Sequence, residues 1–254
     1  KNTFFYFQRK RLFNERQKKW ICWERKRGSL TELGNLLSGS GDTSHVVISS
    51  DISSLKSKIR YIITLDEDTQ LPMDSARKLI GTISHPLNQA VFSPEKGRVE
   101  EGYGFIQPSV SISVSSSNVS RFTHIYARNT GISIYSENIS DLYQDMFNEG
   151  IFMGKGIYDL PLFNKVLTDA IPENRVLSHD LLEGSHIRAA FATDIELVDN
   201  HPTRYFSYIM RLHRWVRGDW QLLPWLKSTI VNKQGKRTAN PLSTLSKWKI
   251  LDNL

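Results

Sequence analysis

The stretch Arg60-Tyr61-Ile62-Ile63-Thr64-Leu65-Asp66-Glu67-Asp68-Thr69 places a short apolar run directly against two acidic residues. The apolar run is typical of a buried strand, and a helix predicted from Ser75 to Ser84 continues an α/β rhythm. Because strand side chains alternate, Asp66 and Asp68 are expected on one side and Glu67 on the other. Open α/β sheets bind ligands at the carboxyl ends of their strands, and Mg²⁺ is held by carboxylates plus substrate phosphates. The stretch predicts a metal and phosphate site, with an acidic turn as the alternative.

The rest of the chain continues the alternation of strands and helices. Strands are predicted at 61–65, 105–114 and 191–198, and helices at 30–37, 75–84, 181–190, 203–226 and from Pro161 onward. Residues 40–55 are rich in Ser, Gly and Asp and are predicted to form a surface loop. We interpret the chain as one α/β domain.

The composition is that of an ordinary folded domain. With 254 residues, of which 39% are hydrophobic, the chain is long enough to bury a sizeable core. No stretch approaches the ~18 apolar residues of a membrane-spanning helix. The single cysteine, Cys22, cannot form an internal disulfide, which is compatible with a reducing compartment.

Positive charge is concentrated at the N-terminal end. Residues 1–27 contain ten Lys and Arg residues and two acidic residues, Glu15 and Glu24, so this segment has a net charge of +8. The local charge exceeds the net charge of +7 of the whole chain. This pattern indicates a local anionic partner, namely a phosphate-bearing substrate, acidic lipid headgroups or RNA. The alternative is a solvated charged face without a ligand. Interleaved aromatic residues such as Trp20 and Trp23 indicate that the segment is partly buried or lies against a membrane.

A second candidate site is the stretch Ser178-His179-Asp180-Leu181-Leu182-Glu183, where a helix is predicted to begin. Asp180 near the helix N-terminus is explained structurally, because the macrodipole stabilises its negative charge. A role as a catalytic base requires in addition that Asp180 lies near the metal site. His179 is a weaker candidate for a metal ligand.

A third candidate is the predicted helix 203–226, in which Arg211, Arg214 and Arg217 recur every three residues on one face. Guanidinium groups match phosphate oxygens bidentately, so this ridge is suited to a phosphate. Trp215 and Trp220 beside it would supply walls for a sugar ring or an apolar anchor. The alternative is a ridge that faces solvent or a membrane surface.

Three glycines, Gly150, Gly154 and Gly156, form the fourth candidate, because glycine allows the backbone to approach a ligand closely. The alternative is a set of tight turns. Gly154-Lys155-Gly156 does not belong to a P-loop, and one cysteine with scattered histidines excludes a recognisable zinc motif.

The order of these motifs resembles the processive family-2-type glycosyltransferases with the GT-A fold. The longer motifs are similar to the glycosyltransferase region of cyclic β-1,2-glucan synthases: Trp23-Glu24-Arg25-Lys26-Arg27-Gly28, Glu101-Gly102-Tyr103-Gly104, Gly154-Lys155-Gly156-Ile157-Tyr158-Asp159 and Arg214-Trp215-Val216-Arg217-Gly218-Asp219-Trp220-Gln221. The resemblance implies a GT-A-like, Rossmann-like mixed sheet flanked by helices. It also implies that residues 1–254 are a partial GT-A domain, incomplete at the N-terminus.

The resemblance assigns roles to individual residues. Asp66 and Asp68 match the D-x-D motif, which holds Mg²⁺ or Mn²⁺ and the UDP diphosphate. Asp180 matches the general base of the T-E-D motif, although His179 replaces its glutamate. Arg214 and Trp215 match the end of Q-x-x-R-W, although Arg211 replaces its glutamine. The substrate-binding residues implied by all the motifs together are Arg27, Gly28, Asp66, Gln107, Gly154, Lys155, Arg211, Arg214 and Trp215.

The resemblance also implies the activity, which is inverting, metal-dependent transfer of glucose from UDP-glucose to a growing β-glucan, with a β-1,2 linkage. The resemblance divides the partial GT-A domain of residues 1–254 into four regions. They are a basic N-terminal segment at 1–39, a D-x-D region at 60–90, an acceptor and base region at 150–226 and a juxtamembrane segment at 238–254. The implied partners are UDP-glucose, a β-glucan acceptor and, through flanking segments outside this chain, a membrane, with no nucleic acid. The implied location is the cytoplasmic face of the bacterial inner membrane.

Two other classes of function remain open from the residues alone. A glycoside hydrolase or phosphorylase would use a carboxylate pair, such as Asp180 with Glu183 or with Asp66. A non-catalytic adaptor for a membrane or RNA would use the basic N-terminal segment.

Overall fold

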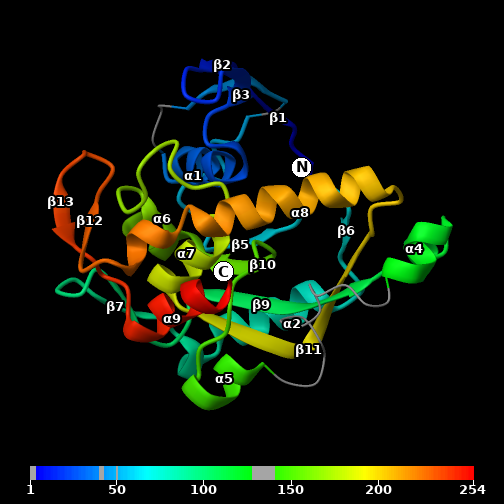
Figure 1. Ribbon diagram of the computed structural model, residues 1–254. Helices are drawn as coiled ribbons and strands as arrows, with labels where there is room; N and C mark the ends of the chain where they lie inside the picture. Colours follow the sequence, from blue (N-terminus) through cyan, green and yellow to red (C-terminus); the bar gives the residue numbers. More distant parts are fainter. Residues whose placement is uncertain (1–3, 40–42, 50, 128–140) are drawn as a thin grey trace.

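A computed structural model describes residues 4–39, 43–49, 51–127 and 141–254 of the chain. Its centre is a mixed five-stranded sheet with the strand order β5-β10-β9-β11-β6 (Figure 1). These strands are β5 Tyr61–Thr64, β6 Thr69–Gln70, β9 Phe105–Ile112, β10 Gly156–Asp159 and β11 Ala189–Asp199. Strands β9 and β11 run parallel, whereas β10 is antiparallel to β5 and β9, and β6 is antiparallel to β11. The predicted α/β class is confirmed, and the arrangement is compatible with a Rossmann-like fold.

Helices cover both faces of this sheet. Neighbouring residues of a strand point to opposite faces, so the strands contribute side chains to a separate core on each face. Phe105, Tyr158 and Ala189 enter the first core, which is closed by helices α1 Arg25–Leu37, α6 Leu160–Leu167 and α7 Asp180–Ile187. Their neighbours in the sequence, Ile106, Ile157 and Ala190, enter the second core under helix α2 Ser75–Ser84. The predicted helix 75–84 is confirmed at both ends.

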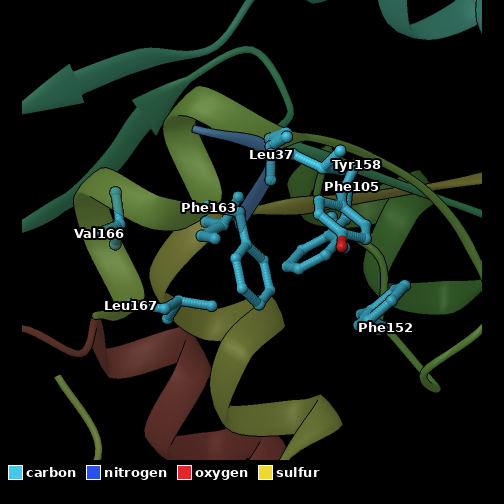
Figure 2. Packing of buried hydrophobic residues seen from close by; sticks show 10 residues of the cluster. Leu37, Phe105, Phe152, Tyr158, Phe163, Val166 and Leu167 are labelled. Carbon is cyan, nitrogen blue, oxygen red and sulfur yellow. The ribbon is translucent and has the colours of Figure 1, made fainter. Parts of the chain in front are cut away.

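Aromatic rings fill the middle of the first core (Figure 2). The rings of Phe105 and Phe152 stack with their centroids 4.0 Å apart, and Phe163 meets Phe105 edge to face. Such ring pairs add to the free energy gained by burying their area. Phe152 immediately precedes the loop Met153–Lys155, so this packing fixes one end of that loop. Met153 and Lys155 line the main cavity of the molecule.

A third core lies on the other side of α7 and includes Leu182, Leu222, Trp225 and Ile250. Its residues come from α7, the 3₁₀ helix η3 Leu223–Leu226, strand β12 Thr229–Val231, helix α9 Thr244–Asp252 and the segments between these elements. Helix α8 Tyr205–Trp220 leads into η3, and strand β13 Arg237–Ala239 pairs with β12. Figure 1 shows α8 as a long helix that crosses one side of the molecule. The predicted helix 203–226 is thus two elements, because α8 ends at Trp220 and the chain turns into η3.

The N-terminal segment forms strands. They are β1 Phe7–Arg9, paired with β4 His45–Ile48, and the hairpin of β2 Arg11–Asn14 with β3 Lys19–Cys22. Strand β4 lies inside the region predicted to be a loop, of which residues 40–42 and 50 are outside the described residues. The remaining elements are η1 Pro86–Asn88, β7 Val91–Ser93, β8 Arg98–Glu101, α3 Val114–Ser117, α4 Arg121–Tyr126 and α5 Leu142–Phe147. In the described ranges, no helix has the length and apolarity needed to cross a membrane.

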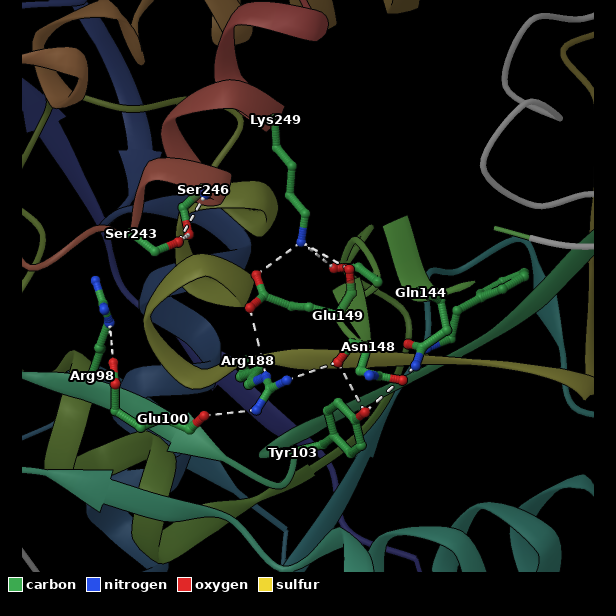
Figure 3. Close-up of polar contacts among 12 residues, drawn as sticks. Arg98, Glu100, Tyr103, Gln144, Asn148, Glu149, Arg188, Ser243, Ser246 and Lys249 are labelled. Atoms are coloured by element: carbon green, nitrogen blue, oxygen red, sulfur yellow. Dashed lines mark hydrogen bonds and ion pairs between the residues drawn. The ribbon is translucent and has the colours of Figure 1, made fainter. Parts of the chain in front are cut away.

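A buried polar network ties α9 to the edge of the sheet (Figure 3). The Lys249 ammonium donates to the Glu149 carboxylate at 2.8 Å and to the Gly150 carbonyl at 2.9 Å, and Lys249 is only 3% exposed. The other Glu149 oxygen lies 3.6 Å from the Arg188 guanidinium. Burial lowers the pKa of Lys249, and the Glu149 carboxylate offsets part of this effect.

Replacing Lys249 by methionine is expected to lower the free energy of unfolding by about 3 kcal/mol, because Glu149 would stay buried without its main cation. Urea unfolding measures this change. The control variant Lys236→Met, at an exposed position in the turn between β12 and β13, is expected to change stability by less than about 0.5 kcal/mol. Equal stability of both variants would show that the network contributes little.

Candidate active site

A cavity of about 1000 Å³ lies between the N-terminal hairpin, the carboxyl end of β5, the loop before β10, the start of α7 and α8. Its wall contains six of the residues predicted for the site, which are Asp66, Lys155, Asp180, Arg211, Arg214 and Trp215. These residues come from four separate parts of the sequence. The fold therefore gathers acidic, basic and aromatic side chains around one space.

Asp66 lies in a turn that follows β5. Strand β5 ends at Thr64, and the Thr69 amide donates to the Asp66 carbonyl at 3.1 Å. The predicted strand geometry, with Asp66 and Asp68 on one side, is therefore wrong, because alternation stops before Asp66. Asp68 does not line the cavity. Its role as a metal ligand stays a prediction.

Two lysines hold the Asp66 carboxylate. Lys26 of α1 lies 2.5 Å from one oxygen, and Lys155 lies 3.4 Å from the other. Burial alone would raise the pKa of Asp66, but the hydrogen bonds and charges of Lys26 and Lys155 outweigh it and lower the pKa. Lys155 is almost fully buried and also pairs with Asp199, which in turn accepts a hydrogen bond from Thr69 at 2.7 Å. Asp66 is thus held as an anion.

Gly154 is linked to Asp66 through Lys26 and lies against Asp180. The Lys26 ammonium that holds Asp66 also donates to the Gly154 carbonyl at 2.7 Å. On its other side, Gly154 has a positive φ of 83°, and a Cβ atom there would lie 2.6 Å from an Asp180 carboxylate oxygen. The fully buried Gln107 fixes this loop by accepting a hydrogen bond from the Met153 amide at 2.8 Å. Gln107 therefore acts on the loop and is not in the cavity wall.

Asp180 is the first residue of α7, and His179 and Glu183 lie behind it. The His179 Nδ1 atom lies 3.3 Å from Asp180 and 3.0 Å from Glu183, which is 1% exposed. Burial alone would lower the pKa of His179, but the Glu183 and Asp180 carboxylates raise it to about 9. His179 is thus a cation at neutral pH. Among the described residues, His179, Asp180 and Glu183 are the group of three whose donor atoms lie close enough to hold a metal.

The arginine ridge of α8 faces the cavity. Arg211, Arg214 and Arg217 all contribute to its wall, as the spacing predicts. The Arg211 guanidinium lies 4.6 Å from the centre of the Trp215 ring, a distance typical of a cation–π contact. Trp220 is 55% exposed and is not in the wall. The ridge therefore supplies positive charge and one aromatic ring to the site.

The structure does not bring Arg27 and Gly28 to the cavity wall. The Arg27 guanidinium is buried, lies 2.5 Å from Glu24 and donates to the Ile171 carbonyl. Gly28 lies directly against the Trp23 carbonyl. These contacts explain both residues by the packing of α1, so the predicted contact with substrate has no support from their positions.

Three of the cavity residues that were not predicted are charged groups that bear on the site: Lys26, Asp199 and Asp219. Lys26 lies inside the quoted motif Trp23–Gly28 and Asp219 inside the quoted motif Arg214–Gln221, but neither motif indicates the contacts that these residues make. Asp199, at the end of β11, belongs to no motif quoted above. The places of all three in the wall follow only from the tertiary structure.

Comparison with known proteins shows a similarity that covers the whole chain. No family model matches the chain. The chain is 46% identical, over 255 aligned residues and its full length, to the cyclic beta-(1,2)-glucan synthase NdvB of Rhizobium meliloti strain 1021. The match confirms the predicted resemblance to cyclic β-1,2-glucan synthases. The chain spans 9% of the length of that synthase, so it is similar to one region of a much larger glucan synthase.

Proposed function

We propose that this chain is the glycosyltransferase region of a cyclic β-1,2-glucan synthase, with a GT-A fold, and that it transfers glucose from UDP-glucose to a growing β-glucan with inversion. One observation carries the proposal: Asp66, Asp180 and the Arg214–Trp215 pair line a single cavity. The similarity to a cyclic β-(1,2)-glucan synthase supports it. We further propose that the reaction takes place at the cytoplasmic face of the inner membrane, to which segments outside this chain attach it.

The Asp66 carboxylate is the candidate ligand for a divalent cation at this end of the cavity. It already contacts the ammonium groups of Lys26 and Lys155, so an ion that binds there would displace at least one of them. Carboxylate oxygens are the ligands that Mg²⁺ and Mn²⁺ prefer. Asp66 and Asp68 would hold the ion, which supplies Lewis-acid neutralisation of the diphosphate when bound.

The cations of the cavity account for the binding of the donor diphosphate. Lys26 and Lys155 lie beside Asp66, and Arg214 of α8 lines the same cavity. Guanidinium and ammonium groups in a partly buried site stabilise phosphate charge more strongly than they would in water. The same groups stabilise the additional charge that develops on the diphosphate as it leaves.

In this proposal, Asp180 is the general base. Its carboxylate is 30% exposed, lies on the cavity wall and borders Gly154. In the transfer, an acceptor hydroxyl oxygen bonds to the anomeric carbon while the bond from this carbon to the UDP oxygen breaks. The hydroxyl proton moves to Asp180. One such displacement inverts the α-linked donor to a β-linked product.

The carboxylate pair of a hydrolase is not supported by these positions. Glu183 is 1% exposed and contacts His179, so it is not available to a substrate. Asp66 is held by two lysines, which favour its charged form and oppose a role as a proton donor. A transferase that uses one base explains the burial of Glu183 better than a pair of catalytic acids.

Chelation of divalent ions tests the proposal. In the protein as it is naturally expressed, EDTA is expected to abolish incorporation of radiolabelled glucose from UDP-glucose, and added Mg²⁺ or Mn²⁺ is expected to restore it. The reason is that the diphosphate would lose its Lewis acid. Glucan cleavage that continues in EDTA, without incorporation, would instead indicate a hydrolase.

A further inference from the structure

Asp219 is a carboxylate in the cavity wall that the reaction described above does not use. It lies in the last turn of α8, four residues after Trp215 and eight after Arg211. Residues spaced by four lie on the same face of a helix, one turn apart. Arg211, Trp215 and Asp219 therefore form a continuous stripe of cation, aromatic ring and carboxylate along the cavity.

The surroundings of Asp219 do not favour a negative charge. Within the part of the chain that the structure describes, no ion pair is formed by Asp219, and the Ser178 side chain is the polar group that lowers its pKa. Burial raises the pKa of Asp219 to about 6, and the bond from Ser178 offsets only a small part of this shift. A charged carboxylate at this place therefore costs the fold stability at neutral pH.

Asp219 is also not needed to attach α8 to the segment before Asp180. Gly218 has no side chain, and a Cβ atom there would lie 2.4 Å from the Cβ atom of Ser178, so the two backbones are already in contact. The Gln221 side chain accepts a hydrogen bond from the Leu177 amide at 2.8 Å. Because these contacts hold the segment in place, a structural role does not explain the acid.

We propose that Asp219 binds the acceptor glucan, by accepting hydrogen bonds from hydroxyl groups of a glucose unit whose apolar face stacks on Trp215. The inference rests on the proposed function and adds a specificity residue to it. An aromatic ring beside a carboxylate matches a pyranose, which presents C–H groups on one face and hydroxyl donors at its edge. The position beside Ser178, two residues before Asp180, places this glucose next to the general base.

The neighbours of Asp219 define how acceptor binding depends on pH. The charged groups that line the same cavity near it are Arg214 and Arg217 on its own helix and His179 and Asp180 at the start of α7. The arginines do not titrate, and the pKa of His179 is about 9. As pH falls through 6, protonation of Asp219 removes a charged acceptor, so the KM for the glucan is expected to rise.

The variant Asp219→Asn tests the proposal in the naturally expressed protein, with a β-1,2-linked glucose oligosaccharide as the acceptor. The KM for the oligosaccharide is expected to rise about 10- to 100-fold, the effect of losing hydrogen bonds to a charged group, whereas the KM for UDP-glucose stays unchanged. The acceptor KM of the variant is also expected to be constant between pH 5 and 8. The matched control Asp169→Asn, at an exposed position outside this cavity, is expected to leave both constants at the wild-type values.

Stability separates this role from a structural one. The native pKa of Asp219 is raised, so the fold binds its proton more tightly than the unfolded chain does, and stability falls as pH rises through about 6. At pH 8, Asp219→Asn is therefore expected to have a melting temperature equal to or above that of the wild type. A lower melting temperature, or failure to fold, would overturn the proposal, as would an unchanged acceptor KM.

Calorimetric titration with the same oligosaccharide keeps the test independent of turnover. If the wild type binds the oligosaccharide and Asp219→Asn binds it at least 10-fold more weakly, the inference holds even if glucose transfer is not observed. Equal binding by both proteins would overturn the inference, whatever the outcome for transfer.

Discussion

Asp180→Asn is expected to lower glucose transfer by about 10²- to 10⁴-fold, because asparagine cannot accept the proton of the acceptor hydroxyl. Asparagine has nearly the same shape as aspartate, so the loop around Gly154 and the cations near Asp66 should stay in place. Binding of UDP is therefore expected to be unchanged. The measurement is incorporation of radiolabelled glucose from UDP-glucose, with UDP affinity measured separately by calorimetry.

The matched control is Asp194→Asn, at an exposed position on β11 outside the cavity. It removes the same charge and is expected to retain full activity. If Asp180→Asn transferred glucose at the rate of this control, Asp180 would not be the base. Loss of both transfer and UDP binding would show that Asp180 supports the structure of the donor site instead.

Gly154→Ala is expected to reduce transfer by about 10²-fold or more. The new Cβ atom would lie 2.6 Å from the Asp180 carboxylate, and the positive φ of 83° is unfavourable for alanine. The collision displaces either Asp180 or the loop that contacts Lys26, and a displacement of about 1 Å at a catalytic group is enough for such a loss. Steady-state kinetics with UDP-glucose and an acceptor measure the effect.

Gly81→Ala is the control for this substitution. Gly81 lies in α2, and nothing lies within 4 Å of an added Cβ atom. Alanine there is expected to leave activity unchanged and to raise stability by about 0.5–1 kcal/mol, because it favours the helix. Equal activity of the two variants would contradict a role in transfer for the close contact between Gly154 and Asp180.

Local patterns predicted much of the fold. The apolar run before Asp66 is β5, and the helix from Ser75 to Ser84 is α2. The three-residue spacing of the arginines predicted a single ridge on one face of α8, and Arg211, Arg214 and Arg217 all line the cavity. These predictions succeeded because hydrophobic periodicity and helical spacing are properties of the local sequence.

Contacts between distant segments could not be predicted in the same way. The basic start of the chain had the composition of a surface segment, but it pairs as strands and sends Lys26 to Asp66, 40 residues later. The turn at Asp66 ended the strand earlier than the apolar run indicated, because Thr69 closes it by a backbone hydrogen bond. Asp219 belongs to the motif Arg214–Gln221, but the motif does not indicate what surrounds this side chain. Its environment depends on the close approach of α8 to Ser178.

The most direct test of the proposed active site is an experimental structure of the protein with UDP and Mn²⁺ bound. The expected result is a diphosphate between Asp66 and Arg214, with the Asp180 carboxylate facing the empty sugar position beyond the β-phosphate. A nucleotide bound outside this cavity, or a diphosphate from which Asp180 is separated by the sheet, would contradict the proposal.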